Sequence, residues 1–242
     1  MKHNARLPIL VLLCASLFMT GCATLPPGSV ASERDPLEPY NRAVYGFNDT
    51  LYRNLLQPVA RGYVAITPDF LRTGVSNFFG NISDLAVFVN DFLQGKPGQG
   101  LEDGGRFVLN TTVGLLGLLD VATPAGLPHH REDFGQTLAV WGWDNSTYLV
   151  LPLLGPSTVR DTLGLVGDTP LGLYTNLHTT NTKLAEIFAF ETVNTRANLL
   201  AASNVLETAA LDPYAFVRDA YLQRRRNMIY DGNPPPTTDD DQ

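Results

Sequence analysis

The chain has 242 residues, a formal net charge of −7 and 44% hydrophobic residues, enough for one folded domain with its own core. An acidic chain is a poor partner for nucleic acid or for anionic lipid headgroups, because both carry negative charge. Any contact with a membrane must therefore be apolar rather than electrostatic.

The first residues are typical of a secretory signal. Lys2, His3 and Arg6 form a short basic region, and an apolar stretch follows from Ile9 to Met19. These 11 residues are fewer than the ~20 that a transmembrane helix needs. The stretch ends in Met19-Thr20-Gly21-Cys22, which looks like a bacterial lipobox. We therefore predict cleavage before Cys22.

Cys22 is the predicted site of lipid attachment. The chain's other cysteine, Cys14, lies in the removed segment, so the mature chain cannot form an internal disulfide. Lipobox lipoproteins carry three acyl chains, and each buried methylene contributes about 0.8 kcal/mol to membrane binding. Removal of Lys2 and Arg6 with the signal lowers the formal charge from −7 to −9.

The predicted domain organisation has four parts. Residues 1–21 are the signal peptide, and residues 22–34 are a flexible tether rich in Pro, Gly and Ser. Residues 35–230 are one helical domain, and residues 231–242 are a disordered acidic tail that contains three prolines and three consecutive aspartates.

The first helix is predicted from Asp35-Pro36-Leu37-Glu38, which combines an N-cap residue, an early proline and a glutamate three residues after the cap. Asp49 and Arg53 can form an ion pair across one turn. The spacing of later apolar residues places them on one helical face. These residues are Tyr40, Val44, Phe47, Leu51 and Leu55.

Two further helices are predicted, from about Ile82 to Gln94 and from Asp212-Pro213 onward. Strand-like alternation is scarce. The best candidate runs from Tyr148 to Leu154, and Pro152 weakens it. The predicted fold class is all-α.

The segment from Phe107 to Leu127 is mostly apolar, and its densest part is Val113 to Leu119. One interpretation is a buried core helix, which the sequence alone favours. The other is a helix lying in the plane of a membrane, whose glycines allow neighbours to approach closely. Trp141 and Trp143 would suit the interface of such a membrane.

An enzyme is the first alternative to a lipid-handling protein. His129-His130-Arg131-Glu132-Asp133 is the one cluster of plausible metal ligands, but adjacent histidines face one site less easily than residues at i and i+4. Ser157 lacks the Gly-x-Ser-x-Gly pattern that exposes a nucleophile. The sequence therefore predicts neither catalytic residues nor a metal or other cofactor.

Seven segments, in order behind the lipobox, resemble the MlaA/VacJ family of outer-membrane phospholipid-transport lipoproteins over nearly all of the mature chain. They are DPLEPYNRAVYGFND (35–49), RTGVSNFFGN (72–81), VNDFLQGK (89–96), RFVLNTTVGLLGLLDV (106–121), DFGQTLAVWG (133–142), VLPLLGPSTVRD (150–161) and DPYAFVRDAYLQR (212–224).

The resemblance implies a single-domain, all-helical ring embedded in the membrane plane, with an amphipathic central channel. It implies a Gram-negative cell, with the protein lipid-anchored in the inner leaflet of the outer membrane and facing the periplasm. Phospholipids misplaced in the outer leaflet would leave through the channel, which maintains lipid asymmetry. The implied partners are phospholipids, a trimeric porin and a soluble periplasmic phospholipid carrier, with energy from an inner-membrane ATP-driven complex.

The resemblance also suggests which residues lie near the lipid path. The candidates are Val44, Phe47, Asn48, Phe134 and Tyr148. The segment 141–147, with Trp141, Gly142 and Trp143, is the candidate gating loop. Ordinary core packing is the alternative role for each of these residues.

A third class is a passive structural lipoprotein that only binds a porin. A narrow apolar face without polar lining would favour it, and the sequence leaves this open. Whether lipid co-purifies intact, co-purifies cleaved or is absent would separate the transporter, the enzyme and the passive lipoprotein.

Overall fold

The computed structural model describes residues 35–201, 203 and 210–236. The predicted signal peptide, Cys22 and the tether lie outside these residues, as does the end of the predicted tail. The first part of that tail is described. Asp231 forms an ion pair with Lys96 at 2.7 Å, and the carbonyl of Pro235 accepts a hydrogen bond from Arg226.

The protein is mostly helical. The long helices are α2 (Glu38–Leu51), α3 (Gln57–Ile66), α4 (Asp69–Leu93), α5 (Pro97–Thr112), α7 (Val159–Asp168), α9 (Asn181–Asn198) and α11 (Pro213–Ile229). Shorter pieces are α6 (Phe134–Val140), α8 (Leu173–Asn176) and a 3₁₀ turn at Thr169–Leu171. A π-helical turn, Tyr52–Leu56, joins α2 to α3.

A small β-hairpin departs from the all-α prediction. Strand β1 (Tyr148–Leu151) pairs antiparallel with β2 (Gly155–Thr158), with Tyr148 opposite Thr158 and Leu151 opposite Gly155. Pro152 lies just after β1, in the turn, where its missing N–H is harmless. The strand signal at Tyr148–Leu154 was therefore real for its first four residues.

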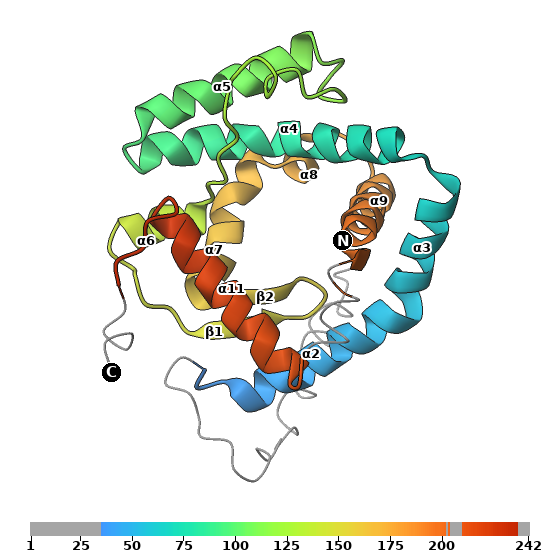
Figure 1. Ribbon diagram of the computed structural model, residues 1–242, viewed down its shortest axis with the longest axis vertical. Coiled ribbons are helices and arrows are strands. Elements are labelled where there is room, and N and C mark those ends of the chain that lie inside the picture. Colours follow the sequence, from blue (N-terminus) through green and yellow to red (C-terminus); the bar gives the residue numbers. More distant parts are fainter. Residues whose placement is uncertain (1–34, 202, 204–209, 237–242) are drawn as a thin grey trace, which may run out of the picture.

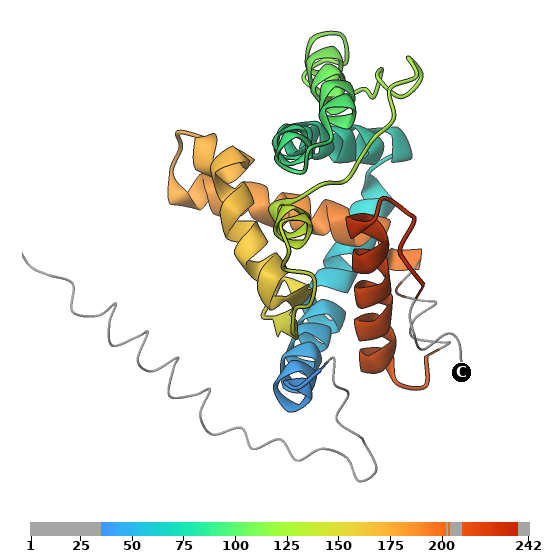
Figure 2. The same cartoon turned by 90° about the vertical axis from the view of Figure 1, so that its left-hand side faces the viewer.

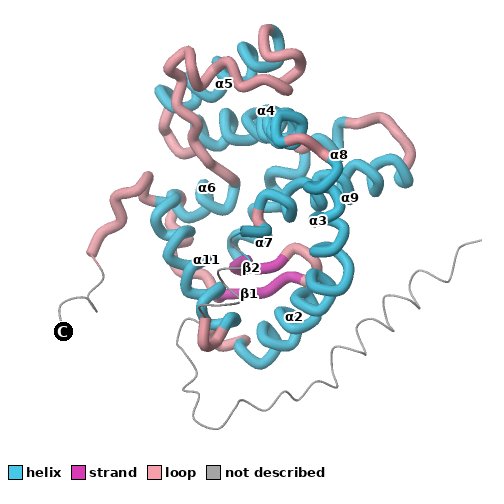
Figure 3. The backbone as a smooth tube through the Cα atoms, turned by 45° about the vertical axis from the view of Figure 1, so that its right-hand side comes forward, coloured by secondary structure: helices cyan, strands magenta, loops and turns pink. Residues whose placement is uncertain are grey.

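The elements follow one another along the sides of the molecule (Figure 1). α2 and α3 run along the lower right, α4 crosses the upper part beneath α5, and α6, α7 and α11 lie toward the left. α4 and α5 form an antiparallel pair that stands at one end, away from α2 and α11 (Figure 2). The hairpin lies beside α2, close to α7 and α11 (Figure 3).

The interior of the described part is more polar than apolar. Nine apolar residues are buried, against twenty polar or charged ones, and Leu and Phe are absent from the buried set. Many large apolar side chains face outward instead, among them Ile66 (82% exposed), Phe70 (73%) and Val166 (69%). This polarity is the reverse of that in a water-soluble protein, where Leu and Phe fill the core. No helix of the described residues is long and apolar enough to span a membrane.

Two sequence predictions about helix ends have opposite outcomes. Asp212 caps α11 as predicted, because its carboxylate accepts the backbone N–H groups of Tyr214 (3.1 Å) and Ala215 (3.2 Å). Asp35 does not cap α2, which begins at Glu38 after Leu37. Glu38 instead pairs with Arg42 at 2.7 Å.

The second predicted helix, Ile82 to Gln94, is the final part of the longer α4. The apolar residues predicted to share a helical face lie on α2 as far as Leu51, whereas Leu55 falls in the π-helical turn. Among those residues only Val44 is buried, whereas Phe47 and Leu55 are 55% and 53% exposed. Asp49 and Arg53 do form the predicted ion pair, at 2.8 Å.

Candidate functional site

Two asparagines on α2 hold the β-hairpin against that helix. The fully buried Asn41 donates to the Tyr148 carbonyl at 3.1 Å and accepts the Val150 N–H at 2.8 Å. Asn48, two turns later, donates to the Leu151 carbonyl at 2.9 Å and accepts the Leu153 N–H at 2.8 Å. The candidate path residue Asn48 therefore fixes the hairpin tip to α2.

Val44 lies between these asparagines and packs in the one apolar cluster of the described core. Its partners there are Tyr148, Val150 and Tyr214. Tyr148 is fully buried, with its ring 6.4 Å from Tyr214. Burial raises the pKa of the Tyr148 hydroxyl because the phenolate would lose its hydration. The structure thus puts the candidate residues Val44 and Tyr148 inside the core.

Asp35 connects this cluster to the C-terminal helix. Its buried carboxylate accepts hydrogen bonds from Asn41 (2.8 Å) and from the Tyr214 hydroxyl, and Arg218 lies 3.6 Å away. These partners lie on α2 and α11, which are far apart in the sequence. A residue that the sequence suggested as a local helix cap therefore stabilises a long-range contact.

Phe47 lies one turn after Val44 on α2 and is 55% exposed. The hairpin tip carries two further exposed apolar side chains, Leu153 (58%) and Leu154 (56%). Asn48, the residue after Phe47, accepts the Leu153 N–H and so holds the hairpin tip against this part of α2.

The candidate gating loop begins at the C-terminal end of α6, where a glycine has a left-handed conformation. Gly142 has φ of +110°, and its N–H binds the Ala139 carbonyl at 2.9 Å. The Trp143 N–H binds the Leu138 carbonyl at 3.0 Å, which completes a Schellman motif at the end of α6. A left-handed conformation is required at Gly142, and glycine adopts it without steric cost.

Both tryptophans of this loop are exposed, and the backbone beneath them is anchored. Trp141 is 58% exposed, and its Nε1 donates to the Leu93 carbonyl at 3.0 Å. Arg160, which is buried, donates to the carbonyls of Trp143 and Asp144, both at 3.0 Å. The loop is therefore attached to α4 and α7.

A buried ion network holds α6, α7 and α11 together. Arg225 on α11 binds Asp133 with both terminal guanidinium nitrogens and also binds Asp161 at 2.9 Å. Asp161 accepts further bonds from Arg160 (3.1 Å) and from the Tyr221 hydroxyl (2.7 Å). Burial alone would raise the pKa of Asp161, but Arg225, Tyr221 and Arg160 together lower it.

Close backbone contact between α6 and α7 needs two glycines. A Cβ on Gly164 would lie 2.4 Å from the Gly135 nitrogen, and a Cβ on Gly135 would lie 2.7 Å from Asp161 Oδ1. The candidate path residue Phe134 starts α6, with its ring 5.8 Å from that of Trp141. Phe134 also packs over Gly167, where a Cβ would be 2.3 Å from its ring. Phe134 and Trp141 are thus brought together, away from the α2 candidates.

The apolar segment Phe107–Leu127 begins as the last part of α5, but its densest part, 113–119, is not helical. α5 ends at Thr112, and the chain turns with positive φ at Leu115 (54°), Leu116 (60°) and Gly117 (89°). Leu115 and Leu116 are 62% and 67% exposed. The core-helix interpretation is therefore wrong for residues 113–119, because these leucines face outward from a turn.

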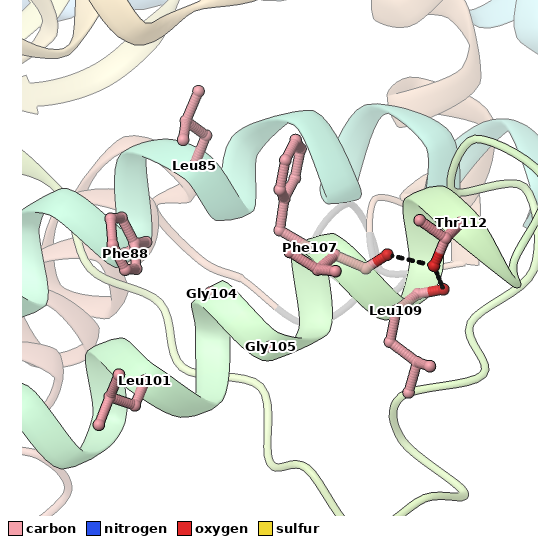
Figure 4. A pocket seen from close by; sticks show the side chains of 9 residues that line it. Leu85, Phe88, Leu101, Gly104, Gly105, Phe107, Leu109 and Thr112 are labelled. Atoms are coloured by element: carbon pink, nitrogen blue, oxygen red, sulfur yellow. Dashed lines mark hydrogen bonds between the residues drawn. The ribbon is translucent and has the colours of Figure 1, made fainter.

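An apolar groove of about 680 Å³ lies between α4 and α5 (Figure 4). The two helices approach closely because Gly104 leaves room for the Phe88 ring, 2.8 Å from where a Cβ would be. Leu101 and Val108 on α5 are 69% and 59% exposed. The groove is lined by Leu85, Phe88, Leu101, Gly104, Gly105, Phe107, Val108, Leu109 and Thr112.

The histidine cluster is divided among separate partners. His129 Nε2 lies 3.1 Å from Asp84, and His130 Nδ1 lies 2.6 Å from Asp103. Glu132 accepts from Gln94 at 2.8 Å. Within the described ranges, no group of three or more His, Cys, Asp and Glu residues could hold a metal ion.

The Ser157 hydroxyl is buried, with Thr162 Oγ1 at 3.0 Å and the Thr158 carbonyl at 3.2 Å. These hydrogen bonds lie within the β2–α7 junction. The serine that the sequence considered as a nucleophile therefore has a structural environment.

Sequence reasoning missed Asn41, Arg160 and Arg225, each of which joins elements that are distant in the chain. Arg225 lies within Arg224-Arg225-Arg226, which resembles an ordinary basic helix end. No local pattern separates Arg225 from such an end, because its partners Asp133 and Asp161 are 92 and 64 residues away in the sequence.

The fold and these contacts define a mostly helical protein with a polar, ion-paired interior and an apolar exterior, which is the polarity of a protein at a lipid interface. The model of the MlaA lipoprotein family matches residues 33–228. The chain belongs to this family.

Named relatives match over nearly the whole chain. The intermembrane phospholipid transport system lipoprotein MlaA of Escherichia coli strain K12 is 36% identical over 237 residues, covering 96% of this chain and 92% of the relative. The protein of the same name from Haemophilus influenzae is 31% identical over 229 residues, covering 93% and 91%. An uncharacterised protein of Rickettsia bellii is 37% identical over 199 residues, covering 81% and 76%.

A solved structure agrees with the fold. It comes from work on the structural basis for maintenance of bacterial outer membrane lipid asymmetry. The TM-score is 0.71 at 37% sequence identity, and the match covers 82% of this chain and 99% of the solved chain.

Proposed function

We propose that this protein is the outer-membrane lipoprotein of an intermembrane phospholipid transport system and performs no bond chemistry. It removes misplaced phospholipids from the outer leaflet and so maintains lipid asymmetry. The observation that carries the proposal is the 36% identity over 96% of this chain to the Escherichia coli transport lipoprotein. The outward-facing apolar side chains, such as Phe70 and Val166, support a place in lipid.

Within this function, the helical circuit is proposed to be a ring in the plane of the inner leaflet, anchored by lipid on Cys22. The succession of α2, α3, α4, α6, α7 and α11 around the molecule supports the ring (Figure 1). An amphipathic channel through it would give the headgroup a polar path and the acyl chains an apolar one. No energy source within the chain is required.

Phe47 is the strongest candidate for contact with lipid tails in this channel. It is exposed, although its neighbour Asn48 is bound to the hairpin, and the exposed Leu153 and Leu154 are at the hairpin tip. Val44 and Tyr148, which are buried, would support this wall from behind. Phe134 would act near the other end of the site, beside Trp141.

The 141–147 segment remains the proposed gate. Because Arg160 binds the Trp143 and Asp144 carbonyls, we propose that the segment moves together with α6 and α7 rather than as a free loop. The exposed Trp141 would then face lipid. The proposed partners are a trimeric porin in the outer membrane and a soluble periplasmic carrier that receives the phospholipid.

The test is complementation in the source bacterium. Deleting the gene should increase outer-leaflet phospholipid, and the wild-type gene should reverse this. Phe47→Asn should fail to reverse it at normal abundance. Phe216→Asn on α11 is the matched control, because both phenylalanines are 55% exposed. An unchanged outer leaflet after deletion would refute the function, and equal effects of the two substitutions would refute the role of Phe47.

A further inference from the structure

Two carboxylates are completely buried between α4 and α5. Asp91, near the end of α4, and Asp103, on α5, are both 0% exposed. The helices are antiparallel neighbours, and a Cβ on Gly100 of α5 would lie 3.2 Å from the Asp91 Cβ. The backbone of α5 therefore lies directly against Asp91, and water is excluded from its carboxylate.

The two carboxylates have unequal hydrogen-bond partners. Asp103 accepts the His130 backbone N–H at 3.3 Å, and the His130 ring Nδ1 lies 2.6 Å from its other oxygen. Neither oxygen of Asp91 has a hydrogen-bond donor among the described residues. A buried carboxylate without a donor is expensive, but a protonated carboxyl can itself donate to the neighbouring carboxylate.

The charges around Asp91 also favour its protonation. Glu132, on the segment before α6, is bound by Gln94 (2.8 Å) and Lys96 (3.2 Å). Lys96 is shared with Asp231 at 2.7 Å, so its charge is already engaged. Glu102 on α5 lies 3.8 Å from His130 Nε2. Negative groups from both helices and from the segment before α6 therefore surround the pair, and the His130 ring contacts Asp103 and Glu102.

We propose that Asp91, Asp103 and His130 form a proton-dependent latch that holds α5 against α4. A proton carried by Asp91 is shared with Asp103, and its loss places two adjacent charges in a site without water. The latch loosens as the pH rises. Because α5 carries the apolar groove and leads into the exposed 113–119 turn, the pH controls how firmly that apolar surface is held.

The direction of the pH dependence follows from the site. Burial first, and then the charges of Asp103 and Glu132, raise the pKa of Asp91 from 3.8 to about 7, although His130 opposes them. A raised carboxyl pKa stabilises the folded contact at low pH, and that stabilisation is lost as the pH rises toward 7. The equilibrium constant for opening of α5 should increase by up to about tenfold per pH unit between pH ~5 and ~7, and then level off.

Hydrogen exchange on the full-length lipidated protein in detergent micelles tests the latch. Amide protection of α5 is measured from pH 5 to 8 in wild type, Asp91→Asn and Glu186→Gln. The last variant removes an exposed carboxyl from α9 and serves as the control. Wild type and variant are compared at the same pH, so the intrinsic pH dependence of exchange cancels. α5 of Asp91→Asn should stay protected at pH 8, whereas wild type and Glu186→Gln lose protection.

Equal pH profiles of wild type and Asp91→Asn would overturn the proposal. A second measurement needs no variant: infrared titration of wild type should show a protonated carboxyl band that persists above pH ~5 and disappears near pH ~7. Absence of that band at pH ~6 would also overturn it. So would restoration of α5 protection at pH 8 by added Ca²⁺, because the pair would then be a cation site and not a proton latch.

Discussion

Removal of the Asn41 side chain should destabilise the protein far more than removal of Asn48. Asn41→Ala loses bonds to Asp35 (2.8 Å), to the Tyr148 carbonyl (3.1 Å) and from the Val150 N–H (2.8 Å), all of them buried. Two lost bonds at about 1 kcal/mol each and one stranded N–H at about 1–3 kcal/mol give about 3–5 kcal/mol. This is a large part of the stability of an ordinary domain.

Asn48→Ala loses two bonds, at 2.9 Å and 2.8 Å, near an exposed tip where water can replace the side chain. Its expected cost is about 1–2 kcal/mol. Chemical denaturation in micelles, followed by circular dichroism, measures both variants. Asn54→Ala is the control, because Asn54 is exposed and bonds only to the Thr50 carbonyl one turn earlier, so it should cost less than about 0.5 kcal/mol.

Hydrogen exchange separates the two roles. Asn48→Ala should increase exchange at the hairpin tip and leave α7 and α11 unchanged. Asn41→Ala should increase exchange at the whole hairpin and at Tyr214, because Asp35 is affected as well. A cost for Asn41→Ala that is no larger than that for Asn48→Ala would refute the conclusion that buried asparagine bonds hold the hairpin.

Three other changes have expected outcomes. Gly142→Pro cannot adopt φ of +110° and loses the N–H bond to Ala139, so outer-leaflet phospholipid and detergent sensitivity should rise at normal protein abundance; a clean outer leaflet would mean that the 141–147 segment is only a connector. The pKa of Asp161 is lowered in the folded protein, so its ionised carboxylate stabilises the fold above the ordinary aspartate range. This stabilisation is lost as the pH falls, and thermal stability should therefore drop below pH ~4. Asp161→Asn should flatten that dependence, and an unchanged slope would contradict it. Cys22→Ser should yield a protein without acyl chains, whereas the intact mass of wild type should show loss of residues 1–21 and the added lipid.

Features that depend on neighbouring residues could be predicted from the sequence. The Asp212-Pro213 start of α11 and the Asp49–Arg53 pair were both predicted, because each depends on residues within one helical turn. Asp35 was misassigned because its partner Tyr214 is 179 residues away. No local pattern distinguishes a cap from a buried carboxylate whose partners are brought together by the fold.

The burial of the candidate residues could not be predicted from the sequence, because apolar periodicity shows which residues share a face and not whether that face meets water or lipid. In water, Phe47 and the leucines of the 113–119 turn would point inward, and buried positions would be apolar. Here Leu115 and Leu116 face outward, while Asn41 and Arg225 are buried. The positive φ at two successive leucines also has no sequence signal, since leucine rarely adopts it.

The polar interior has a consequence for engineering. Side chains such as Ile66, Phe70 and Val166 contribute little to internal packing, because they are 82%, 73% and 69% exposed. The fold is specified instead by directional bonds between groups such as Asp133, Arg225 and Asn41. Replacement of these exposed side chains with lysine or glutamate should therefore leave the internal hydrogen bonds and ion pairs intact. We expect such a variant to keep its helical circular dichroism spectrum in water without detergent.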